Sequence, residues 1–99
     1  MLRVLGRARA LIREPSLWTK DCFSREDGSA RRRDLVRAVG VASLEVAQTH
    51  DDTLGLCDDV LDELRRAVDN ENLAVWNDRP ERAHSDVLNL LDLVITRLT

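Results

Sequence analysis

Apolar residues recur at helical spacing along most of the chain. In residues 2–14 they return every three or four positions, and arginines occupy most of the positions between them. This spacing predicts an amphipathic helix. Pro15 follows, and the helix should end there because proline disfavours the α conformation in the residue before it. We expect its core face to comprise Leu2, Leu5, Ala8, Leu11 and Ile12.

Three later segments show the same periodicity. Residues 31–48 carry a broad apolar face, residues 54–68 follow the i, i+3, i+4, i+7 pattern closely, and a last helix runs from Pro80 or Ala83 to Leu98. Gly40 stands in the middle of the first of these segments, where glycine costs about 1 kcal/mol relative to alanine. We therefore expect another element to approach the backbone closely at Gly40.

Two shorter segments lack a helical period. Residues 17–25 alternate in a way that predicts an extended segment, and residues 73–76 are too few to indicate a helix. We expect these two segments to pair, with helices packed behind them. The predicted fold is α+β and mostly helical, with four helices and a short two-stranded β element formed by about 17–25 and 73–76. Residues 1–99 form one domain, because a chain of this length has room for one core.

Charge is unevenly distributed along the chain. Residues 1–37 contain ten basic and five acidic side chains, whereas residues 38–99 contain five basic and thirteen acidic ones, which together give the net charge of −3. We expect the basic N-terminal layer to pair with the acidic C-terminal layer within the molecule. The alternatives are head-to-tail self-association and a charged partner.

Several functional classes find no support in the sequence. Cys22 and Cys57 lack CxxC spacing, so we expect free thiols. Nothing brings His50, Asp51, Asp52 and His84 together, and we predict neither a metal nor a cofactor. No apolar run approaches the roughly 20 residues of a membrane span. Arginines interrupt the first residues, which is not typical of a signal peptide.

The stretch LAVWNDRPERAHSDVLNLLDLV, residues 73–94, has two interpretations. In the architectural one, Asn77 or Asp78 caps the last helix and Trp76 is an apolar anchor. In the functional one, Asn77, Asp78, Arg82 and His84 line a polar pocket beside Trp76, with a helix N-terminus that suits an anion.

These residues also carry a resemblance. The segments RARALI, WTKD and AVGVASL, followed by the C-terminal stretch, resemble a family of small actinobacterial and actinophage proteins of unknown function. The shared C-terminal motif is WNDxPxRxHxxVLxLLD, and Trp18 and Thr19 match an earlier W-T element. Relatives often carry a Trp-Cys pair where this chain has Val36 and Arg37, so a thiol nucleophile present in relatives would be missing here. The resemblance implies a cytoplasmic protein of a bacterial cell or a phage-infected host, and it implies no known activity.

The function predicted from these observations is that of a small non-enzymatic accessory protein. It would bind a host protein, or it would bind a second copy of itself to form a homodimer. Its candidate binding or fold-defining residues are Trp18, Trp76, Asn77, Asp78, Arg82 and His84. One alternative is a small-ligand binder or enzyme that uses Asn77, Asp78, Arg82 and His84. The other is a nucleic-acid-binding module that uses the N-terminal arginines, which the negative net charge and the lack of interleaved aromatic residues disfavour.

Overall fold

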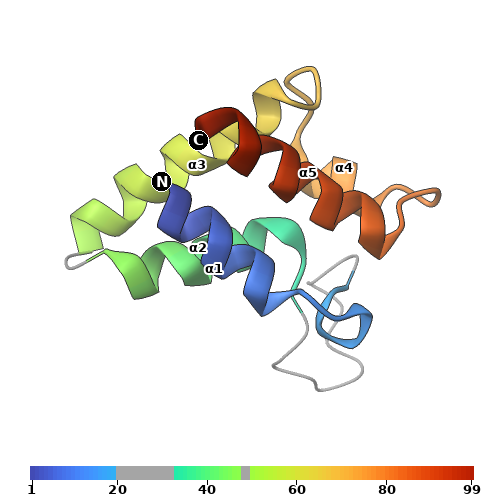
Figure 1. Cartoon of the computed structure of the whole chain (residues 1–99), viewed down its shortest axis with the longest axis horizontal. Coiled ribbons are helices and arrows are strands. Elements are labelled where there is room, and N and C mark those ends of the chain that lie inside the picture. Colours follow the sequence, from blue (N-terminus) through green and yellow to red (C-terminus); the bar gives the residue numbers. More distant parts are fainter. Residues whose placement is uncertain (20–32, 48–49) are drawn as a thin grey trace.

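A computed structural model describes residues 1–19, 33–47 and 50–99 of the chain, without the side chains of His50 and Asp51. Its helices are α1 (Leu2–Leu11), α2 (Leu35–Val46), α3 (His50–Arg66), α4 (Leu73–Asp78) and α5 (His84–Leu98), with a short 3-10 helix, η1 (Pro15–Leu17), after α1. Figure 1 shows α1 and α5 in front of the hairpin formed by α2 and α3, with the short α4 behind the start of α5.

The predicted two-stranded β element is wrong. Within the described residues the fold is helical and contains no strand. Residues 73–76 belong to α4, residues 15–17 form η1, and residues 20–25 lie outside the described residues. The extended backbone at Trp18 makes one isolated parallel bridge, and its partner is Arg33 rather than residues 73–76.

A local cap explains why residues 73–78 are helical. The side chain of Asn72 accepts a hydrogen bond from Val75 N at 3.1 Å, which satisfies one of the free amides at the start of α4. Leu73, Trp76 and Asn77 then fall at i, i+3 and i+4 and are buried together, while Val75 is 54% exposed. Burial of this face stabilises a helix too short to be stable alone.

The four predicted helices are all present. α1 ends before Pro15, as predicted, and α5 begins at His84, directly after Ala83. In α1 the buried face differs from the predicted one, because Val4 is buried and Leu2 is 40% exposed. Among the residues that the structure describes, none outside this stretch of α2 lies within 4 Å of a Cβ built on Gly40, so they make no close approach of the expected kind.

The core is aliphatic and receives residues from all five α-helices. α2 packs against α1, α3 and α4, and α5 packs against α1 and α3. Trp76 is the large aromatic side chain in this core, at 8% exposure. The other buried apolar residues are Val4, Leu5, Ala8, Ile12, Leu35, Ala38, Val39, Ala42, Val60, Leu64, Leu73, Val87, Leu90, Leu91 and Val94.

Two ion pairs join the basic N-terminal helix to later helices. The Nε of Arg7 lies 2.5 Å from Glu45 Oε2 on α2, and the Nε of Arg9 lies 2.6 Å from Asp92 Oδ1 on α5. Part of the charge asymmetry is therefore neutralised inside the molecule, as expected from the sequence. None of the helices in the described part of the chain is long and apolar enough to cross a membrane.

Candidate functional site

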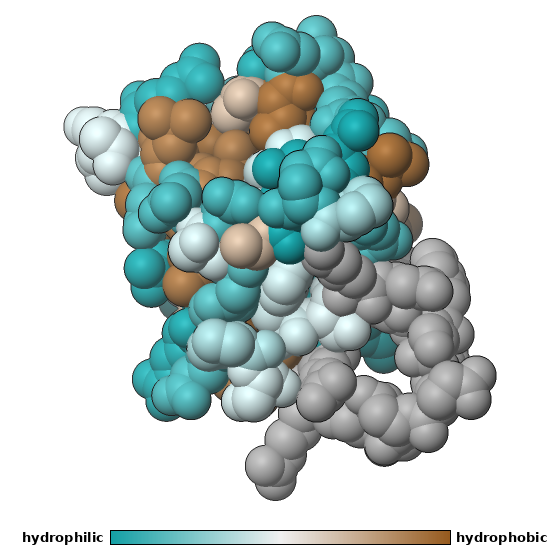
Figure 2. Space-filling view, turned by 90° about the vertical axis from the view of Figure 1, so that its right-hand side faces the viewer, coloured by the Kyte–Doolittle hydropathy of each residue, from teal (hydrophilic) through white to brown (hydrophobic). Residues whose placement is uncertain are grey.

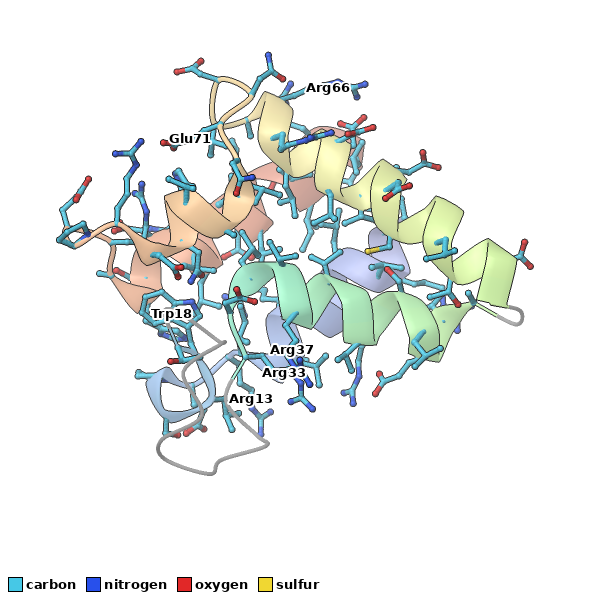
Figure 3. The ribbon with its side chains drawn as sticks, turned by 180° about the vertical axis from the view of Figure 1, so that it is seen from behind. Arg13, Trp18, Arg33, Arg37, Arg66 and Glu71 are labelled. Atoms are coloured by element: carbon cyan, nitrogen blue, oxygen red, sulfur yellow. The ribbon has the colours of Figure 1, made fainter. Side chains whose placement is uncertain are left out.

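Most of the residues singled out by the sequence meet at one junction. The junction joins the segment after α1, the start of α2, α4 and the start of α5. Figure 3 shows Trp18 at its edge, between the segment after α1 and the helices α4 and α5. The side chains in contact there are those of Trp18, Trp76, Asn77, Asp78, Arg82 and His84.

Asn77 is the fully buried centre of this junction. Its Oδ1 accepts hydrogen bonds from Trp18 Nε1 at 2.7 Å and from Leu35 N at 3.2 Å. Its Nδ2 donates to Thr19 O at 3.1 Å and to Asp78 Oδ1 at 3.0 Å. A carboxamide has two donor hydrogens and two acceptor lone pairs, and all four are used. Asn77 therefore has no free hydrogen-bonding capacity for a ligand.

The predicted capping role of Asn77 was assigned to the wrong helix. α5 begins after Ala83, whose amide donates to the Asp86 carboxylate at 2.9 Å. Asn77 instead accepts from Leu35 N, the first residue of α2. The N-cap of α2 is Asp34, which accepts from Arg37 N at 2.8 Å. Asn77 thus satisfies a free amide of a helix more than forty positions earlier in the sequence.

His84 ties the start of α5 to the end of α1. Its Nε2 lies 2.6 Å from the carbonyl oxygen of Ile12, the C-cap residue of α1. A carbonyl can only accept, so Nε2 carries the proton of this hydrogen bond. The Trp18 and His84 rings are tilted by 47° with their centroids 5.9 Å apart. His84 is therefore held by α1 and Trp18 together.

Arg82 closes the loop between α4 and α5 over Trp76. Its Nε donates to Trp76 O at 2.9 Å, and its Cζ lies 3.9 Å from the centroid of the Trp76 ring. This geometry combines a hydrogen bond with a cation–π contact. Asp78 is exposed and accepts from Asn77 Nδ2. The four residues proposed as a polar pocket thus contact the fold itself, and this geometry favours the architectural interpretation.

Two of the arginines of the nucleic-acid alternative already have carboxylate partners within the molecule. Arg7 and Arg9 are paired with carboxylates, and Arg31 and Arg32 lie outside the described residues. In Figure 3 the side chains of Arg13, Arg33 and Arg37 lie around the start of α2. No three His, Cys, Asp or Glu side chains are placed to hold a metal ion in the parts of the chain that the structure describes.

A hollow that the sequence did not predict lies between α2, α3 and α4. Its volume is about 530 Å³, and its lining combines aliphatic with charged side chains. The two charges of Arg65 and Asp62 pair with each other one turn apart on α3. No sequence signal identifies such a hollow, because three helices supply its lining residues: Val36, Asp58, Leu61, Asp62, Arg65, Asn72, Leu73 and Ala74.

Cys57 is a half-buried thiol on α3 that packs against the hydrophobic core. Burial raises its pKa above the ordinary value of 9.0; the nearby Ser43 hydroxyl opposes this rise and the Asp58 carboxylate adds to it. A raised pKa keeps the thiol protonated near neutral pH, whereas nucleophilic catalysis needs the thiolate. Cys57 therefore lacks the electrostatic setting of a catalytic cysteine. Cys22 lies outside the described residues.

Several large aliphatic side chains remain exposed. Leu44 on α2 is 62% exposed, Leu54 on α3 is 55% exposed, Val75 on α4 is 54% exposed and Leu93 on α5 is 49% exposed. Figure 2 shows apolar residues gathered in the upper half of one face and bordered by hydrophilic residues, on the side where α4 and the start of α5 lie. Contiguous exposed apolar surface commonly marks an interaction site.

The comparisons with known proteins identify the family. Residues 1–97 match the model of a family of unknown function, DUF6197, so the chain belongs to that family. The match agrees with the resemblance seen in the sequence as far as a family of unknown function that spans nearly the whole chain. Neither the curated proteins nor the solved structures gave a match.

Proposed function

We propose that this protein is a small non-enzymatic accessory protein that acts by binding another protein. The observation that carries the proposal is the contrast between the polar residues of the junction and the exposed aliphatic residues of the surface. The chemically distinctive side chains, Asn77 above all, are occupied in the junction. The surface instead offers aliphatic side chains on four helices and a partly apolar hollow. Apolar surface next to charged groups is what protein partners recognise.

The proposed partner is a protein of the bacterial cell in which this protein acts. The resemblance to actinobacterial and actinophage proteins directs the choice of lysate, which should come from an actinobacterium. We propose that the protein acts in the cytoplasm of such a cell, on a resident protein of that cell. A charged partner suits the uneven charge of the chain, and electrostatic attraction would make the complex tighter at low salt.

Affinity capture tests this proposal. The full chain is immobilised at low salt in lysate, retained proteins are identified by mass spectrometry, and the best one is purified and titrated against the chain. We expect one protein that binds in defined stoichiometry. Two double variants probe the exposed aliphatic surface, Leu44→Glu with Leu54→Glu and Val75→Glu with Leu93→Glu. Because these side chains are about half exposed or more, the variants should fold.

The proposal fails under a defined outcome. It is overturned if no protein is retained above the blank column, whether sedimentation then shows a monomer or a self-associated form. Loss of binding in one double variant but not in the other would assign the interface to the corresponding helices.

A further inference from the structure

The hollow between α2, α3 and α4 has a composition suited to one kind of occupant. Its aliphatic lining comes from Val36 on α2, Leu61 on α3, and Leu73 and Ala74 on α4. Figure 3 views the molecule from the side on which α2 and α3 run across the front, with α4 beside the start of α2. A volume of about 530 Å³ is ample for one or two large side chains. Burial of an aliphatic group there would supply binding free energy.

The charged part of the lining is acidic in excess. Arg65 is already paired with Asp62. Asp58 is exposed and forms no ion pair with any residue that the structure describes, and the same holds for its neighbour Asp59. A basic side chain can therefore approach Asp58 without displacing an existing partner. An acidic peptide, a nucleic acid or an anionic lipid surface would meet like charge here.

We propose that this hollow binds a partner segment that inserts an aliphatic side chain between α2, α3 and α4 and sets an arginine or lysine against Asp58. This inference rests on the proposed function and names the chemistry of the partner. The aliphatic side chain supplies most of the affinity by burial against Val36, Leu61 and Leu73. The basic side chain supplies selectivity and a salt dependence, because an exposed ion pair contributes little affinity by itself.

A random peptide library displayed on phage provides the probe. Selection against the immobilised full chain at low salt should enrich peptides with an aliphatic residue within one helical turn of an arginine or lysine. A synthetic peptide of this kind is then titrated against the variants. Val36→Trp fills the hollow and Asp58→Lys reverses its charge. Val36→Trp should weaken binding by about tenfold or more, the scale of losing one well-packed aliphatic contact. Asp58→Lys replaces an attraction by a repulsion at an exposed position, so it should weaken binding severalfold at low salt and less at high salt.

Matched variants control for size and charge. Leu44→Trp adds the same side chain at an exposed position near the other end of α2, and Glu81→Lys reverses one charge in the loop between α4 and α5. Both should bind the peptide as the unchanged chain does. Circular dichroism checks that each variant folds. If Val36→Trp does not fold, Asp58→Lys at an exposed position carries the test.

The outcomes separate this inference from the proposed function. It is overturned if no peptide is enriched, if the enriched peptides lack the aliphatic–basic pair, or if Val36→Trp and Asp58→Lys bind them unchanged. Self-association that Val36→Trp abolishes would also overturn it, because the occupant would then be a second copy. If a lysate protein binds both variants normally, the proposed function stands and this inference fails.

Discussion

At the scale of single residues, the contacts of Asn77 explain the Trp-Asn-Asp segment of this chain, residues 76–78. A buried carboxamide is costly unless it is hydrogen-bonded, and Asn77 meets this condition through three groups from two other segments, the one after α1 and the start of α2. Each of these groups would lose its hydrogen bond to Asn77 if Asn77 were truncated. Removal of one side chain therefore affects the segment after α1 and the start of α2 as well as α4 itself.

Replacement of Asn77 should be strongly destabilising. Asn77→Ala removes the acceptor of the hydrogen bonds from Trp18 Nε1 and Leu35 N. We expect the free energy of unfolding to fall by at least about 2 kcal/mol, since one unsatisfied buried group costs about 1–3 kcal/mol. Urea denaturation measures the change. Asn89→Ala, at an exposed position on α5, is the control and should stay within about 0.5 kcal/mol of the unchanged chain. Equal stabilities of the two variants would contradict the role assigned to Asn77.

Cys57 should react slowly with alkylating reagents. Burial and Asp58 raise the pKa of its thiol, so little thiolate is present near neutral pH. In a Cys22→Ser background, where Cys57 is the remaining cysteine, the rate of alkylation by iodoacetamide should rise with pH to a midpoint above 9.0, the ordinary value. Asp58→Asn should lower that midpoint because it removes a negative charge. A midpoint below 9.0 in the parent would show that the thiol is activated instead.

At the scale of helices and loops, periodicity predicted the long elements and failed for the short ones. α1, α2, α3 and α5 each span at least ten residues, enough for the helical repeat to be visible. α4 has six residues, of which the first four are all apolar. Such a run fits a helical and an alternating pattern equally well. The sequence signal that could have indicated this helix was Asn72, a residue type that favours the N-cap position. The extended segment at Trp18 was predicted, but its bridge to Arg33 depends on tertiary packing.

Gly40 is a weak point of α2 that can be strengthened. It lies within the helix, and a Cβ added there meets no atom of a neighbouring described residue within 4 Å. Gly40→Ala should therefore raise the free energy of unfolding by about 0.5–1 kcal/mol through the lower entropy of the unfolded chain and better helix propensity. Thermal denaturation followed by circular dichroism measures the effect. A lower melting temperature would mean that another segment packs closely against the backbone at Gly40 in solution.

The contact between α1 and α2 should respond to acid. The hydrogen bond from Arg7 lowers the pKa of Glu45 below its ordinary value of 4.5. A lowered pKa in the folded state means that the stabilisation is present above pH 4.5 and is lost as the pH falls through the folded-state pKa. Glu45→Gln should therefore reduce the loss of stability between neutral and acidic pH. Denaturant titrations at several pH values measure this, with Glu81→Gln as the control. The same acid response in Glu45→Gln and the unchanged chain would exclude the contribution of this pair.

At the scale of the whole molecule, the residues of the candidate site were predictable but their purpose was not. The sequence marked Trp18, Trp76, Asn77, Asp78, Arg82 and His84, yet Trp18 meets Asn77 across 59 positions and Ile12 meets His84 across 72. Such contacts follow from the packing of helices rather than from spacing along the chain. The hollow went unseen for the same reason, because α2, α3 and α4 each contribute only part of its lining.

The junction makes the two tryptophans reporters of global unfolding. The Cα radius of gyration of 12.7 Å is close to the value of about 13 Å expected for a compact domain of 100 residues. Trp18 and Trp76 both lie where the segment after α1, α2, α4 and α5 meet, so their environment should persist until the helices separate. We expect the transitions followed by tryptophan fluorescence and by far-ultraviolet circular dichroism to coincide, as in two-state unfolding of one domain. Asn77→Ala should shift both transitions together. A fluorescence change that precedes the loss of helix would show that the junction opens independently, and it would contradict the prediction that residues 1–99 behave as a single domain.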